Sequence, residues 1–195
     1  MHPFTALFLA AFALATGLRL LLARRQYRHV RMHREAVPRS FSEQVPIDAH
    51  RKAADYTCAK TGLGAVGTLV DAALLIALTF GGGLNLADRI ASAWLDPGIV
   101  HGIAIIALVA LATSIVELPL GLYRTFRLEA RFGFNKMTWQ LFVIDLLKGT
   151  LLAIALGGPL LALILWLMQA AGELWWLYAW GAWSLFNLLL LAIYP

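Results

Sequence analysis

Five long apolar runs dominate the sequence and limit what the chain can fold into. A helix of about 20 apolar residues crosses the roughly 30 Å hydrocarbon core of a bilayer. The expected spans are residues 4–23, 63–86, 99–122, 139–170 and 174–194. The fourth run is longer than a span requires, so we expect it to tilt or to project beyond the bilayer. The sequence therefore predicts an all-α fold, a polytopic membrane bundle of five transmembrane helices in a single domain over residues 1–195.

The composition excludes an ordinary soluble domain. Of the 195 residues, 61% are hydrophobic and only 14% are charged, whereas soluble domains are nearer half apolar with about a quarter charged. The net charge of +5 does not indicate nucleic-acid binding, because the basic residues cluster beside the apolar runs instead of covering one face. The single cysteine, Cys58, excludes an intrachain disulfide.

The placement of lysine and arginine predicts the orientation in the membrane. Nearly all of them lie in residues 24–62 and 123–138, while the segment between the second and third spans holds only Arg89. Cytoplasmic loops carry an excess of lysine and arginine. We therefore expect these two segments to be cytoplasmic loops, with the N-terminus outside and Pro195 inside. The arginines of the first run follow it instead of preceding it, so we expect an uncleaved anchor and not a signal peptide.

The first cytoplasmic loop is expected to be partly helical. Asp48 is a candidate N-cap, and the alanines and lysines after it favour a helix from about Ala49 that leads into the second span. The run Gly81–Gly83 is expected to loosen the outer end of that span.

Motifs for catalysis and metal binding are incomplete. His29 and His33 are four residues apart, a spacing that can bind zinc on a helix, but Val30 occupies the place where zinc proteases have their glutamate base. We interpret this stretch as a basic patch that faces anionic lipid headgroups. No serine-hydrolase elbow, Walker loop, dinucleotide fingerprint or Cys-x-x-Cys occurs. The sequence therefore predicts neither a catalytic residue nor a metal ligand in this chain.

Charged residues within the apolar runs are candidates for function, because ionisable groups are costly inside a membrane. The candidates are Asp71, Glu117, Asp145 and Lys148. One interpretation places them around a polar chamber in the cytoplasmic half of the bundle. In the other they are structural, since they pair with one another or with Arg124 and Arg127 and hold helices in register. Asp145 and Lys148 are three residues apart, which suits an ion pair on one helical face.

The stretch LPLGLYRTFRLEARFGFNKMT, residues 118–138, resembles the cytoplasmic loop of the CAAX prenyl protease type of integral-membrane zinc metallopeptidase, bacterial members included. The matching positions are Pro119, Tyr123, Phe126, Glu129, Gly133, Phe134, Asn135 and Thr138. The similarity continues in AHRKAADYT of the first loop and in Asp145 and Lys148. It covers most of the chain.

The resemblance implies that this chain is the N-terminal transmembrane domain of such a protease, as a fragment, a split domain or a truncated product. The family has seven spans and a zinc-binding His-Glu-x-x-His in a cytoplasmic catalytic domain, a motif that this sequence lacks. The chain would form part of an intramembrane chamber, would be inactive alone, and would support that catalytic domain. The resemblance further implies zinc in the full-length enzyme, a membrane-associated or prenylated peptide substrate, and a bacterial cytoplasmic membrane.

On this interpretation residues 123–138 form a cytoplasmic elbow under the catalytic domain. Glu129 and Asn135 would cap helix ends or pair with arginines, and Phe132 and Phe134 would pack the elbow in place. Two other classes of function remain open from the sequence. One is a non-catalytic membrane scaffold for a separate partner chain, and the other is a small transporter, which the one-sided placement of the buried charges disfavours.

Overall fold

The computed structural model describes residues 2–38 and 43–193. Every regular element within those residues is a helix, and five helical segments are long and apolar enough to cross a membrane, as predicted. Residues 39–42 of the predicted first loop, and residues 194 and 195 at the end of the predicted fifth span, fall outside the described residues. The chain forms two compact units, Met1–Gly81 with Ala112–Met137, and Gly82–Leu111 with Thr138–Pro195.

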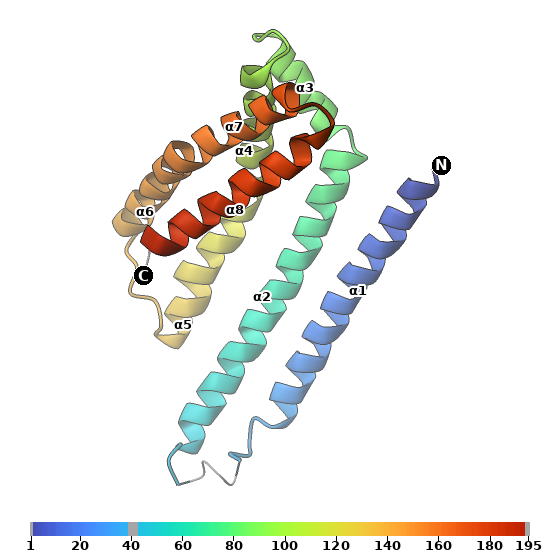
Figure 1. Cartoon of the computed structure of the whole chain (residues 1–195). Coiled ribbons are helices and arrows are strands. Elements are labelled where there is room, and N and C mark those ends of the chain that lie inside the picture. The colour runs from blue at the N-terminus through green and yellow to red at the C-terminus, as the bar shows by residue number, and fades with distance from the viewer. Residues whose placement is uncertain (1, 39–42, 194–195) are drawn as a thin grey trace. The chain divides into compact units, whose positions relative to one another are not determined.

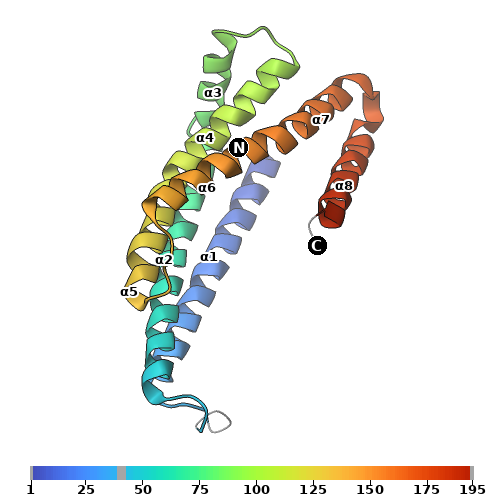
Figure 2. The ribbon, with the colours of Figure 1, turned by 90° about the vertical axis from the view of Figure 1, so that its left-hand side faces the viewer.

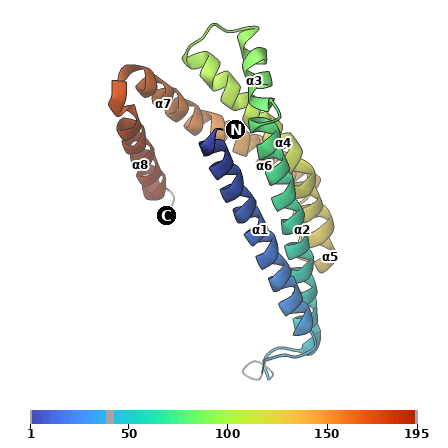
Figure 3. The same cartoon turned by 90° about the vertical axis from the view of Figure 1, so that its right-hand side faces the viewer.

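The first unit begins with two long antiparallel helices, α1 (Pro3–Met32) and α2 (Ile47–Thr79), which lie side by side (Figures 1 and 3). Pro3 stands at the start of α1, where a missing N–H costs nothing. The His2 ring accepts a hydrogen bond from the Phe4 N–H at 3.3 Å. Because α1 continues to Met32, the arginine-rich stretch after the predicted span is helical.

The predicted helix from about Ala49 into the second span is confirmed, but its N-cap and its outer end differ from the prediction. The helix begins at Ile47 with Pro46 as its N-cap, so Asp48 lies within the first turn and is not the N-cap. The Asp48 carboxylate lies 3.4 Å from the Arg51 guanidinium. It ends at Thr79 and not at Leu86. Gly82 has a φ of 79°, in the left-handed region that favours glycine, and this residue breaks the helix. The short helix α3 (Gly83–Ser92) follows as a separate element.

The third long helix extends well beyond its predicted span. The α4 helix (Ile99–Tyr123) continues without a break into a π-helical turn, η2 (Arg124–Glu129), and a final turn, α5 (Ala130–Phe132). Residues 99–111 belong to the second unit and the remainder to the first. The predicted cytoplasmic loop 123–138 is therefore helical up to Phe132. Single π-helical turns within α-helices often mark functional sites.

The second unit also contains the last two long helical segments. The fourth consists of α6 (Trp139–Leu152), the π-helical turn η3 (Ala153–Gly157) and α7 (Gly158–Ala170). Pro159 explains this turn, because it has no N–H to donate and its ring crowds the carbonyl four residues before it. A short turn, η4 (Gly172–Leu174), then leads into α8 (Trp175–Ile193), and α7 and α8 form a hairpin (Figure 2).

Few side chains are buried, which agrees with a membrane environment. Among the described residues the buried ones are Ala54, Ala87, Ala91, Leu128, Phe132 and Leu160. The most apolar windows of the five candidate spans have no buried residues. Apolar surface of this extent is typical of a protein that faces lipid or further protein. The chain is an integral membrane protein.

Candidate functional site

The end of the long third helix is closed by a specific turn. Gly133 has a φ of 75° and donates its N–H to the Ala130 carbonyl at 3.1 Å. Phe134 donates its N–H to the Glu129 carbonyl at 2.9 Å. These two bonds form a Schellman motif, which satisfies the last carbonyls of a helix and requires a left-handed residue, usually glycine. Glu129 and Gly133 therefore contribute through their backbone.

The residues after this turn define a second bend and the start of α6. The Asn135 side-chain oxygen accepts a hydrogen bond from the Met137 N–H at 2.6 Å, instead of capping a helix or pairing with an arginine. The Thr138 hydroxyl accepts one from the Leu141 N–H at 3.2 Å, which caps α6. The polar positions of the sequence motif thus specify the path of the chain from Phe132 to Trp139.

Aromatic side chains fasten this turn to α2. The Tyr56 ring makes edge-to-face contacts with Phe132 and Phe134, at centroid separations of 5.4 and 4.8 Å. Lys52 Nζ lies 5.5 Å from the Phe134 ring centroid, and Phe132 is buried. The predicted packing role of the two phenylalanines is confirmed. The turn is held on α2 by aromatic contacts, which are directional and apolar.

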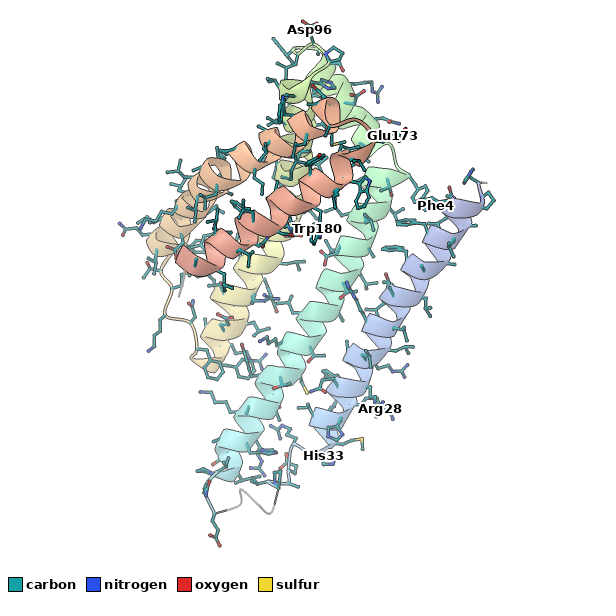
Figure 4. The ribbon with its side chains drawn as sticks, viewed as in Figure 1. Phe4, Arg28, His33, Asp96, Glu173 and Trp180 are labelled. Atoms are coloured by element: carbon teal, nitrogen blue, oxygen red, sulfur yellow. The ribbon has the colours of Figure 1, made fainter. Side chains whose placement is uncertain are left out.

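Ion pairs join the residues that follow α1 to the first turns of α2. Figure 4 labels Arg28 and His33 at this end of α1. Arg34 donates from Nε and Nη2 to the two carboxylate oxygens of Asp55, at 2.7 and 2.8 Å. It also pairs with Glu35, which accepts from Arg51 Nε at 2.8 Å. The two-point Arg34–Asp55 contact fixes the relative orientation of the two helix ends.

These pairs lower the pKa of two carboxyl groups. The hydrogen bond from Arg34 is the main cause for Asp55, with a smaller contribution from the charge of Arg131. The pKa of Glu35 falls chiefly through the hydrogen bond from Arg51 and then through that from Arg34. Both groups lie before the predicted second span.

We expect the contact between α1 and α2 to weaken in acid. A carboxyl whose pKa is lower in the folded state stabilises that state fully above its unfolded pKa, near 4, and loses this contribution as the pH falls through the folded value. Asp55→Asn should therefore reduce thermal stability at neutral pH, and the difference from the parent chain should shrink below about pH 4. Asp96→Asn, at an exposed position outside the helices, serves as a control. A stability difference that is independent of pH would contradict this account.

A groove of about 1010 Å³ lies beside the turn, entirely within the first unit. It runs between α2 and the end of the third helix. Apolar side chains line one part, including Leu63, Val66 and Leu120. Arg127 and Arg131 line another part. We refer to it as the arginine groove.

The four charged candidates lie on exposed helix surfaces. Asp71 lies on α2, Glu117 on α4, and Asp145 and Lys148 on α6. Within the described residues no ion pair forms between Asp145 and Lys148, or from Asp71 or Glu117 to the arginines of the same unit. Their exposure is compatible with a polar chamber, which remains a prediction.

His29 and His33 lie side by side at the end of α1. Their ring centroids lie 4.3 Å apart, and Nδ1 of His33 is 2.8 Å from the His29 carbonyl oxygen. Neither histidine belongs to a group of three or more potential metal ligands in the part of the chain that the structure describes.

The sequence interpretation missed three residues that make these contacts: Tyr56, Arg34 and Asp55. Arg34 and Asp55 are 21 residues apart and no periodic pattern links them. Tyr56 lies in the stretch AHRKAADYT, which carried the family resemblance but gave no indication of its partners.

The fold and the turn define a class: a polytopic helical membrane domain with a structured segment after its third span. Residues 26–195 match the family model described as "CAAX prenyl protease N-terminal, five membrane helices". The chain belongs to this family, and the recognition made from residues 118–138 is confirmed.

Individual relatives agree. A probable CAAX prenyl protease 1 of Schizosaccharomyces pombe is 30% identical over 193 residues, which cover 90% of this chain and 40% of the relative. A CAAX prenyl protease 1 homolog of Oryza sativa subsp. japonica is 42% identical over 97 residues, or 50% of this chain and 23% of the relative. The chain spans less than half the length of these relatives.

The fold has also been seen in a solved structure. The crystal structure of S. mikatae Ste24p superposes with a TM-score of 0.85 at 24% identity, covering 100% of this chain and 46% of that one. The fold of the domain is therefore shared over its full length.

Proposed function

We propose that this chain is the membrane half of a zinc metalloendopeptidase, in which it forms part of the wall of an intramembrane chamber and supports a cytoplasmic catalytic domain. The observation that carries the proposal is the family match over residues 26–195. The turn at residues 129–138 suits the supporting role, because it contains two hydrogen-bonded bends and contacts Tyr56 of α2 through two aromatic rings.

The proposal assigns no catalytic residue to this chain. By the family resemblance, both the metal and the base that activates water are expected in the catalytic domain of the full-length enzyme. The substrate would be a membrane-associated or prenylated peptide, as the names of the relatives suggest. Asp71, Glu117, Asp145 and Lys148 are proposed to make the chamber wall polar, since chains of ionisable groups inside a membrane usually serve a function.

The proposed orientation places residues 123–138 in the cytoplasm and the turn between α7 and α8 outside, in a bacterial cytoplasmic membrane. It rests on the excess of lysine and arginine in residues 24–62 and 123–138.

This orientation is open to a direct test, because Cys58 is the only cysteine. In a Cys58→Ser background, Glu173→Cys should react with a membrane-impermeant maleimide added outside intact cells. Lys136→Cys should react only after the membrane is permeabilised. The reverse labelling pattern would contradict the orientation, and an otherwise cysteine-free chain provides the background signal.

A further inference from the structure

The arginine groove crosses the predicted boundary of the membrane. The second span is predicted to begin at Leu63 and the third to end at residue 122, which places Leu63, Val66 and Leu120 within the apolar region. Arg127 and Arg131 lie beyond it, on η2 and α5. The groove is thus apolar on the membrane side of the boundary and cationic on the aqueous side.

The positive charge of the groove is not compensated by its own lining, which contains no aspartate or glutamate. Arg127 makes no ion pair with any described residue. Arg131 lies over the Phe132 ring, 5.7 Å from its centroid. The charge of Arg131 lowers the pKa of the nearby Asp55 carboxyl, but this carboxylate already accepts two hydrogen bonds from Arg34. Two guanidinium groups are therefore available to an anion.

We propose that the arginine groove binds one anionic phospholipid. Its phosphate would be held by Arg127 and Arg131, since guanidinium groups donate paired hydrogen bonds to phosphate oxygens. An acyl chain would follow Leu63, Val66 and Leu120 into the bilayer. The volume of about 1010 Å³ lies at the upper limit of ligand pockets, which typically measure about 300–1,000 Å³, and this suits a large ligand such as a lipid. This inference is independent of the proteolytic function and requires only that the chain lies in a membrane.

The charge requirement can be tested with a matched pair of double variants. The purified chain is examined by native mass spectrometry with phosphatidylglycerol and, separately, with phosphatidylcholine. One phosphatidylglycerol should bind to the parent chain. Binding should weaken about tenfold to thirtyfold in Arg127→Gln/Arg131→Gln, given the usual contribution of two arginines near an anionic lipid. Arg124→Gln/Lys136→Gln removes the same charge from the same segment outside the groove, and it should change binding less than about twofold.

The shape requirement has its own variant, which leaves the charge unchanged. Gly62 lines the groove, and a Cβ added there meets nothing within 4 Å. Gly62→Leu should fill the groove and weaken phosphatidylglycerol binding, whereas Gly64→Leu, equally open and outside the groove lining, should not. Circular dichroism checks that all variants keep their helix content.

Three results would overturn the proposal. An equal loss of phosphatidylglycerol binding in Arg127→Gln/Arg131→Gln and in Arg124→Gln/Lys136→Gln would indicate general electrostatic attraction. Undiminished phosphatidylglycerol binding by Gly62→Leu would show that the lipid binds outside the groove. Equal binding of phosphatidylcholine and phosphatidylglycerol would show that the arginines do not select an anionic lipid.

Discussion

Gly133→Val should destabilise the domain by about 2 kcal/mol, because a side chain on a left-handed residue costs roughly 1–2 kcal/mol and β-branching adds to that cost. The φ of 75° at Gly133 is required by the Schellman motif that ends α5. A Cβ built at this position meets only Lys52 Nζ, at 3.7 Å, an ordinary contact. The first atom of a side chain therefore fits, and the expected cost arises from the backbone conformation. The midpoint of thermal unfolding, measured in detergent at one scan rate, should fall by several degrees.

Two matched variants separate this cause from others. Gly133→Asn should be milder than Gly133→Val, since asparagine tolerates the left-handed region. Gly121→Ala lies inside α4, where an added side chain meets nothing within 4 Å, and it should leave stability unchanged or raise it. If valine and asparagine at position 133 had equal effects, the required backbone conformation would not be the source of the loss.

Tyr56→Ala should destabilise the domain by about 1–3 kcal/mol, because it removes two edge-to-face contacts and opens a cavity beside Phe132. Tyr56→Phe keeps the ring and should cost less than about 0.5 kcal/mol. The measurement is again thermal unfolding of the purified chain.

A double-mutant cycle tests whether the turn and α2 are coupled through these rings. Phe134→Leu alone should be destabilising, and in the Tyr56→Ala background it should cost much less, because the partner ring is already absent. Additive effects of the two substitutions would show that Phe134 does not stabilise the domain through Tyr56.

The apolar runs were sufficient to predict the five long helical segments, because a bilayer leaves a polar backbone few other solutions. The ends of the helices were harder to predict. The α2 helix stops at Thr79 since Gly82 takes a left-handed conformation, and hydrophobicity alone extends the run to Leu86. The third helix continues to Phe132 through residues that are charged enough to indicate a loop.

The site was predicted in part. The residue types of the turn indicated a family, and the structure gives their physical reasons: a left-handed glycine, a side-chain-stabilised bend at Asn135 and aromatic packing by Phe132 and Phe134. The partners of these residues could not be predicted, because Tyr56 and Phe134 are far apart in sequence and only the folded chain brings them together. The same is true of Arg34 and Asp55.

The most direct test of the central proposal is zinc content and peptidase activity after complementation. The purified chain is assayed alone and after addition of the catalytic half of a full-length relative as a separate polypeptide, with a prenylated peptide as substrate. We expect no activity and no stoichiometric zinc in the chain alone, and both in the combined sample. Failure of the two halves to associate, or stoichiometric zinc in the chain alone, would contradict the proposed division between a chamber domain and a catalytic domain.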